Sequence, residues 1–311
     1  MRSFVSHGTT VLTILASSAI SISRADVIGT AASVAGCYTT SFNQTIDTGC
    51  SEESADVHLD FTAPSQTSFS GNVSVATGSS AVETLTGSAY ASAGVLKGTI
   101  TSLVTSGSPP VKGILGDAYG LMLDTLTISD PLLDGEPGSL VLGMSADAKG
   151  SGAIAIDSGI TTSSALWVYA GEAVPSFPIA GTSFFVPGSL SIPSYSGPAV
   201  PLIFGEPVSI ELYFEAGAGA FCLNDTACQN WSAEGVSASV NASDTAVLNS
   251  LKVYDNNGAL VPSTDWTITA ASGLNYTPTG IVPEPSFFVP LLIVLGAFAF
   301  FTARRIPEPR L

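Results

Sequence analysis

Acidic side chains are the groups with which this chain could most readily do chemistry. Glu211 and Glu215 lie in the stretch "PVSIELYFEAG", and a glycosidase needs only two carboxyl groups at a fixed separation. Four residues along one face of a strand separate these two by about 13 Å, which is too far for that reaction. We therefore expect both to be solvated acids on the outer face of a strand.

Histidine and serine form no recognisable catalytic arrangement. His7 is close to the N-terminus, and His58 alternates with apolar residues in "DVHLDF", which predicts a position on the outer face of a strand. None of the many serines lies in a G-x-S-x-G elbow, and the chain has too few histidines to activate one. We expect no catalytic residues and a protein that is not an enzyme.

One loop, "SDPLLDGEPG", carries the hard oxygen ligands that Ca²⁺ prefers. It contains Asp130, Asp134 and Glu136, and "YDNNG" adds Asp255 elsewhere in the chain. Neither segment has the EF-hand spacing, and the same residue types are typical of turns. The three acids of the loop are weak calcium candidates, and we expect no other metal and no cofactor.

The cysteines point to disulfides if the chain is exported to an oxidising compartment. Of the three possible pairings we favour the local ones, Cys37 with Cys50 and Cys222 with Cys228. The alternative is four free, buried thiols. Metal binding is not indicated, because neither spacing is a two-residue clip and histidine partners are missing.

Short alternating runs separated by turn residues must position these groups. In "PVSIELYFEAG" the apolar residues from Val208 to Phe214 alternate with the polar ones from Ser209 to Glu215. Similar runs are "DVHLDFTA", "LDTLTIS", "SLVLGMSA", "SALWVYA" and "DWTITAAS". Asn257-Gly258 in "YDNNGALV" predicts a tight hairpin. Because no long helical period occurs, the pattern predicts an all-β fold, an antiparallel, jelly-roll-like β-sandwich of roughly ten or more strands.

Residues 26–280 are expected to form this β-sandwich. The Pro/Gly-rich stretch 173–201 could divide it into two units, or could consist of long loops and edge strands, where proline is tolerated. Since the charge does not change across this stretch, we prefer one domain.

The charge balance excludes two classes of partner. Charged residues are 11% of the chain, against roughly 25% in ordinary domains, and Gly, Ser, Thr and Ala take their place, which suits sheets with hydroxyl-rich outer faces. Between Asp26 and Val282 the cations are four lysines: Lys97, Lys112, Lys149 and Lys252. Such a body repels phosphate backbones and anionic headgroups, so we expect no nucleic-acid partner and no peripheral membrane binding.

The N-terminus has the three parts of a secretory signal. Arg2 precedes the apolar run "VLTILASSAISI", which is followed by the small-residue pattern "SRA". Residues 1–25 are therefore expected to be a signal peptide, with export through the Sec translocon and a cut after Ala25. A cut after Ala19 is the alternative.

The C-terminus has the parts of a membrane anchor. Residues 286–303 carry no charge, and 18 residues of helix span roughly 27 Å, just enough for the hydrocarbon core. Arg304 and Arg305 follow directly and would hold that end in the cytoplasm. The membrane is thus expected as a partner only through this helix.

Residues 281–311 resemble the tripartite sorting tail of PEP-CTERM proteins of Gram-negative bacteria. The resemblance lies in the order of "VPEPS", an apolar span and "RR". It implies that Pro283, Glu284 and Pro285 are a motif recognised by a membrane-embedded cysteine protease, the exosortase, which would cut nearby. A second "PEP" at 307–309 has no apolar span after it, and the stub after Arg305 is longer than expected. The run "DTAVLNSLKVYDNNGALV" also resembles the last strands of uncharacterised members.

Two other interpretations of the tail stay open. It could be an ordinary single-pass anchor, or a glycolipid-anchor signal of a eukaryotic surface protein. Six Asn-x-Ser/Thr sequons favour the latter slightly, but a charged end does not suit a removable lipid-anchor tail.

The resemblance implies a non-catalytic protein of the cell surface or extracellular matrix, with a structural, adhesive or exopolysaccharide- and biofilm-associated role. A carbohydrate-binding module is the nearest variant, in which Trp167, Trp231 and Trp266 could stack on sugars. The alternatives are an extracellular carbohydrate-active hydrolase that uses two carboxylates and a membrane-anchored ectodomain.

Overall fold

The computed structural model describes nine segments of the chain, residues 28–39, 48–58, 63–74, 82–106, 113–152, 160–172, 180–184, 188–222 and 236–282. These segments are mostly β-strand and contain no helix. All paired strands run antiparallel. The all-β class and the antiparallel sheets predicted from the sequence are therefore confirmed.

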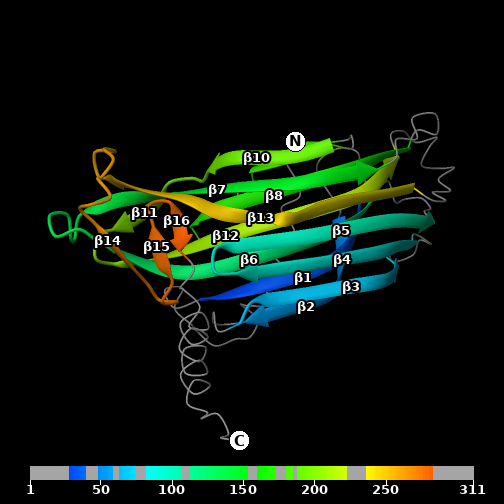
Figure 1. The fold of residues 1–311 in the computed structure, drawn as a ribbon, viewed down its shortest axis with the longest axis horizontal. Coiled ribbons are helices and arrows are strands. Elements are labelled where there is room, and N and C mark those ends of the chain that lie inside the picture. The colour runs from blue at the N-terminus through cyan, green and yellow to red at the C-terminus, as the bar shows by residue number, and fades with distance from the viewer. Residues whose placement is uncertain are drawn as a thin grey trace, which may run out of the picture.

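Two seven-stranded sheets form the body (Figure 1). Sheet A has the order β2-β1-β6-β12-β8-β9, and β14 also pairs with β6. Its strands are β1 (Gly29–Thr39), β2 (Thr48–His58), β6 (Gly113–Ser129), β8 (Ile160–Glu172), β9 (Ala180–Phe184), β12 (Pro207–Cys222) and β14 (Thr267–Ala270). Sequence neighbours such as β5, β6 and β7 alternate between the sheets, which ties the two layers together.

Sheet B has the order β10-β7-β13-β5-β4-β3, and β11 also pairs with β7. Its strands are β3 (Ser65–Ser74), β4 (Val82–Ser92), β5 (Val95–Ser106), β7 (Pro137–Gly152), β10 (Gly188–Ser196), β11 (Val200–Ile203) and β13 (Val236–Asp255). β15 (Asn275–Thr277) and β16 (Gly280–Val282) pair with each other as a separate two-stranded sheet, a short hairpin. β8 and β12, on either side of 173–201, are neighbours in sheet A.

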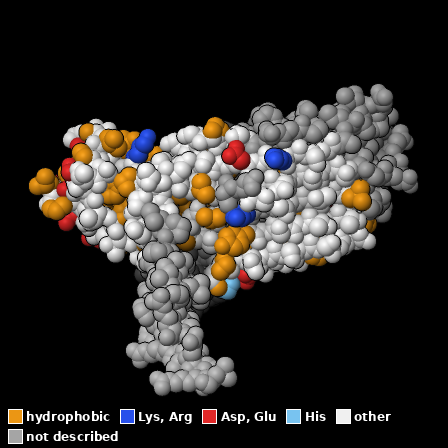
Figure 2. Space-filling model, in the orientation of Figure 1, with side chains coloured by type: hydrophobic (Ala, Val, Ile, Leu, Met, Phe, Trp, Pro, Cys, Tyr) orange, Lys and Arg blue, Asp and Glu red, His pale blue; other side chains and the backbone are white. Residues whose placement is uncertain are grey.

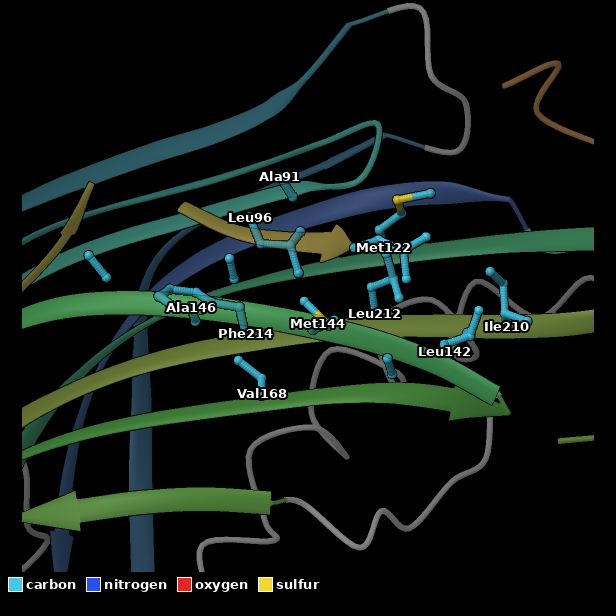
Figure 3. Close-up of a cluster of buried hydrophobic side chains, with 14 of the residues drawn as sticks. Ala91, Leu96, Met122, Leu142, Met144, Ala146, Val168, Ile210, Leu212 and Phe214 are labelled. Atoms are coloured by element: carbon cyan, nitrogen blue, oxygen red, sulfur yellow. The ribbon is translucent and has the colours of Figure 1, made fainter. Parts of the chain in front are cut away.

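The main core lies between the two sheets (Figure 3). Met122 of β6, Met144 of β7 and Phe214 of β12 belong to one buried cluster. The apolar face predicted for "PVSIELYFEAG" supplies Ile210, Leu212 and Phe214 to it, so the predicted alternation along this strand is confirmed.

The predicted hairpin at Asn257-Gly258 is present. The Asp255 amide donates to the Ala259 carbonyl, and the Gly258 amide donates to the Asp255 carbonyl. Gly258 has φ +76, a conformation that costs glycine little. The Asp255 carboxylate also accepts hydrogen bonds from the amides of Asn257 and Ala259. Asp255 is thus used for the turn itself.

Removing a large side chain from the core should be costly. Phe214 is fully buried between the sheets, so Phe214→Ala should lower the free energy of unfolding by about 3–5 kcal/mol through lost burial and a new cavity. Urea unfolding of the body measures this. Leu132→Ala, at a residue that is 90% exposed, is the control and should change stability by less than about 0.5 kcal/mol; equal effects would contradict this core.

Candidate functional site

Acidic and tyrosine side chains gather on the face of sheet A that points away from the main core. Glu211, Tyr213 and Glu215 alternate with the core residues of β12, and all three are buried. Neighbouring positions on this face, Tyr119 of β6 and Tyr169 of β8, are buried as well. We call this surface the acid–tyrosine face. Both faces of sheet A are therefore buried along its central strands.

The expectation of solvated acids at Glu211 and Glu215 is wrong. Both side chains are 0% exposed. The alternation placed them on the correct side of the strand, but this side is not open to solvent. Large buried side chains on the same face, Leu121, Leu123 and Tyr119 of β6, surround them with apolar and aromatic atoms.

A pair of carboxyl groups lies at the centre of the acid–tyrosine face. Asp117 of β6 and Glu215 of β12 are diagonal neighbours, since Glu215 pairs with Tyr119 and Asp117 pairs with Gly217. Their side chains share a hydrogen bond, which requires one of the two to carry a proton. The Tyr213 hydroxyl also donates to Glu215, and the Tyr119 and Tyr213 rings stack with centroids 6.2 Å apart.

Burial makes protonation of these acids easier. It raises the pKa of Asp117 well above its ordinary value, and the nearby charges of Glu215 and Glu83 raise it further. Burial alone raises the pKa of Glu211. The phenol of Tyr213 is also held in its neutral form, because burial and then Glu215 raise its pKa. The arrangement therefore holds protons on acids rather than exposing negative charge.

Glu211 is not part of the pair. Among the described residues neither of its carboxyl oxygens has a hydrogen-bond partner, and its cross-strand neighbours are Leu123 and Gly171. A buried carboxyl group without partners is favoured as the neutral acid.

Sequence reasoning missed the Asp117–Glu215 pair. The two residues are far apart in the chain and meet only through the register of β6 against β12. Alternation within a strand predicts on which face of that strand an acid lies. It does not predict which strands are neighbours in the sheet. Both groups are fully buried.

Glu83 is another buried acid, and it lies on the core side of sheet B. Ser102 donates to its carboxylate at 2.6 Å, and its other oxygen has no partner among the described residues. Burial raises its pKa to about 7, although the Ser102 hydrogen bond acts in the opposite direction.

The weak calcium candidates serve the loop that contains them. The Leu132 amide donates to Asp130 at 2.9 Å, and the Asp130 amide donates to Asp134 at 3.1 Å. Asp134 and Glu136 are exposed. Within the described ranges, no group of three or more His, Cys, Asp or Glu residues is placed to hold a metal ion.

The other candidate side chains lie apart from the acid–tyrosine face. His58 is partly exposed, and its Nε2 lies 3.4 Å from Asp56. Trp266 is buried in the main core and donates to the Val261 carbonyl at 3.3 Å. Trp167 belongs to β8, and Trp231 lies outside the described residues.

The register of sheet A places Cys37 directly opposite Cys50. Directly opposed residues of antiparallel strands have Cα atoms about 4.5–5.5 Å apart, within the range that a disulfide spans. Cys222 ends β12, and Cys228 lies outside the described residues. Both disulfides stay predictions.

The predicted leader and tail also lie outside the described residues. This applies to residues 1–25, to Pro283, Glu284 and Pro285, and to Arg304 and Arg305. In the portion of the chain that is described, no helix is long and apolar enough to cross a membrane.

Comparisons with known proteins give the chain no family. No protein-family model matches it, and no curated protein matches it. A structure of infectious bursal disease virus, Gx strain, aligns with 88% of this chain and 74% of the viral chain at 9% identity, with a TM-score of 0.11. This likeness is too low to support an inference about fold or function.

The buried acids should make the protein less stable as the pH rises. The native pKa of Glu83 is raised from 4.5 to about 7, so its contribution to stability is complete below pH 4.5 and is lost as the pH rises through 7. Glu83→Gln should remove about 3 kcal/mol of this pH dependence. Urea unfolding at several pH values between 5 and 9 measures it.

The control for this prediction is Glu206→Gln, at an exposed turn, which should leave the pH dependence as in the wild type. In Glu83→Gln the free energy of unfolding should still fall somewhat with pH. This remaining dependence is expected from Asp117 and Glu211, whose pKa values are also raised. If Glu83→Gln and the wild type lose stability in parallel, Glu83 is not protonated in the native state.

Proposed function

We propose that this chain is a non-catalytic exported protein of the cell surface or extracellular matrix, sorted by its PEP-CTERM-like tail. The support from sequence is the order of its parts: a leader, a body almost free of cations, a Pro-Glu-Pro motif, an apolar span and two arginines. The body is a jelly-roll-like sandwich in this proposal, and the tail is a transient inner-membrane helix that the exosortase removes.

The observation that carries the proposed role is the outer face of sheet B (Figure 2). Serine and threonine side chains recur along its strands. Figure 2 shows this face mainly in white, the colour of the backbone and of side chains that are neither apolar nor charged, with a few lysine, acidic and apolar side chains among them. We call this surface the hydroxyl face, and it includes Ser68, Ser70, Thr86, Ser88, Thr99, Thr101, Ser151 and Ser239.

Neighbouring strands connect these hydroxyl groups in pairs. Ser88 and Thr99 lie 2.7 Å apart across β4 and β5, and Ser151 and Ser239 lie 2.6 Å apart across β7 and β13. Such pairs hold the side chains in fixed positions. A side chain that is already held loses less conformational entropy when a partner binds than a freely rotating one would.

A neutral polysaccharide fits the chemistry of this face. Hydroxyl groups both donate and accept hydrogen bonds, as sugar hydroxyl groups do, and a face with few charges avoids the cost of stripping water from ions. Each contact is weak, but a polymer repeats its sugars and the sheet repeats its strands, so many contacts can add up. A structural or adhesive role in a matrix requires this kind of binding and no catalysis.

The C-terminus of the mature protein tests the sorting part of the proposal. Peptide mapping of protein recovered from the medium and envelope of the native producer should find a chain that ends near Pro285. A chain that still carries Arg304 and Arg305 would overturn sorting and leave an ordinary membrane-anchored ectodomain.

Binding to the producer's own extracellular polymer tests the role of the hydroxyl face. Thr86→Glu and Thr101→Glu place charges at exposed positions of this face, and the double variant should reduce co-sedimentation with the polymer at least about fivefold, because the charges must be desolvated. Asn256→Glu, in the exposed hairpin loop at Asn257-Gly258, is the control.

Equal co-sedimentation of the double variant and the wild type would remove the hydroxyl face from the proposal. Release of reducing sugar from the polymer by the wild-type protein would favour the hydrolase instead.

A further inference from the structure

The last described element of the chain directly precedes the proposed sorting motif in the sequence. The hairpin of β15 and β16 pairs Asn275 with Val282 and Tyr276 with Ile281. Pro283 is the next residue after Val282. The sequence therefore provides no spacer between the folded body and the Pro-Glu-Pro motif.

A buried carboxyl group of sheet A holds this hairpin. Asp124 of β6 is 0% exposed and accepts a 2.8 Å hydrogen bond from the Tyr276 hydroxyl. The Ser272 hydroxyl also donates to it, as does the Ser272 amide at 3.2 Å. The Thr125 amide completes the set at 2.7 Å. We call Asp124, Ser272 and Tyr276 the Asp124 latch.

The other side of the hairpin docks on sheet B. The Leu251 amide of β13 donates to the Pro278 carbonyl at 3.0 Å. A Cβ atom at Gly280 would lie 2.2 Å from the Leu248 carbonyl oxygen, and one at Gly94 would lie 2.6 Å from Ile281. The hairpin thus fits against the body so closely that neither glycine leaves room for a side chain.

We propose that the Asp124 latch controls how fast the sorting protease gains access to the Pro-Glu-Pro motif. This inference rests on the proposed sorting function. In the docked state the residues directly before the motif are held in a strand, and the motif becomes accessible when the latch opens and β16 leaves the body.

The reason is that a protease binds its substrate as an extended, unpaired chain on both sides of the cut. The backbone groups of Gly280, Ile281 and Val282 are engaged by β15, and Ile281 packs against the main core. A membrane-embedded enzyme would have to bring its cleft against the folded body or wait for the hairpin to open. Local opening of a short terminal element costs less than global unfolding, so opening is the accessible route.

The experiment follows processing in the native producer by pulse-chase labelling and C-terminal peptide mapping. Tyr276→Phe and Ser272→Ala remove donors of the latch but keep Asp124 and the size of the side chains close to native. Each should speed the appearance of the mature chain roughly tenfold, the factor expected when one hydrogen bond to a carboxyl group is lost. A variant with a flexible Gly/Ser spacer of about six residues between Val282 and Pro283 should be processed equally fast. In this variant Tyr276→Phe should have no further effect on the processing rate.

Two control variants separate the latch from general effects. Tyr195→Phe makes the same chemical change on β10, away from the hairpin, and should process like the wild type. Val168→Ala weakens the main core through β8 and should not reproduce the acceleration. Hydrogen exchange of the purified body should show lost protection in residues 275–282 of Tyr276→Phe and unchanged protection in β6 and β12.

The outcomes distinguish this inference from the proposed function. A wild-type chain that keeps Arg304 and Arg305 overturns sorting, and the role of the latch in processing with it. A wild-type chain that is processed at the same rate as Tyr276→Phe overturns the latch alone. Unchanged exchange in residues 275–282 of Tyr276→Phe shows that Asp124 does not hold the hairpin.

Discussion

The close approach of the two sheets is the constraint on which this structure depends. A Cβ atom at Gly116 would lie 2.2 Å from Leu85, one at Gly87 would lie 2.6 Å from Ile100, and one at Gly98 would lie 3.0 Å from both Phe214 and the Ala118 carbonyl oxygen. Alanine fills much of the remaining contact layer, as at Ala89, Ala146, Ala216 and Ala242. A core built from small residues can be dense only if the two sheets lie close together. At this short separation a large residue such as Phe214 has room only where the opposite strand carries a glycine, here Gly98.

This packing also gives a second reason for the composition of the chain. Abundant small residues and low charge suggested sheets with hydroxyl-rich outer faces, and the outer face of sheet B has that character. Gly87, Gly98, Gly116 and many of the alanines, however, lie between the sheets. Small residues therefore serve two different purposes on the two sides of the same strands.

The scarcity of cations determines how the buried acids are stabilised. The body has no arginine, so Asp117 and Glu215 have a proton, a phenol and one another as partners. Asp117 and Glu215 share a hydrogen bond, and Tyr213 donates to Glu215. A buried ion pair would have cost desolvation of two charges, whereas two carboxyl groups that share a proton carry one negative charge fewer. The consequence is a body whose stability falls as the pH rises and these acids lose their protons.

The sequence was sufficient to predict the features that depend on one strand or one turn. The faces of β12 followed from alternation between Val208 and Glu215, and the hairpin at Gly258 followed from its residue types. The burial of Glu211 did not follow, because alternation separates two faces of a strand without saying whether each face is covered. The Asp117–Glu215 pair and the Asp124 latch were also out of reach, since both depend on the register or packing of segments that are far apart in the chain.

The position of Asp124 links the hairpin of β15 and β16 to the centre of the fold. β6 pairs with β1 and β12 along most of its length and with β14 near its end, so it is one of the most firmly held strands of sheet A. The hairpin of β15 and β16 can dock fully only after both sheets have assembled, because Asp124 comes from sheet A and the Leu248–Leu251 stretch that receives the hairpin comes from sheet B. In the proposed sorting pathway, a chain whose hairpin has not docked is an incompletely folded chain. Control of the motif by the latch therefore makes the folded state of the body and the accessibility of its sorting signal interdependent.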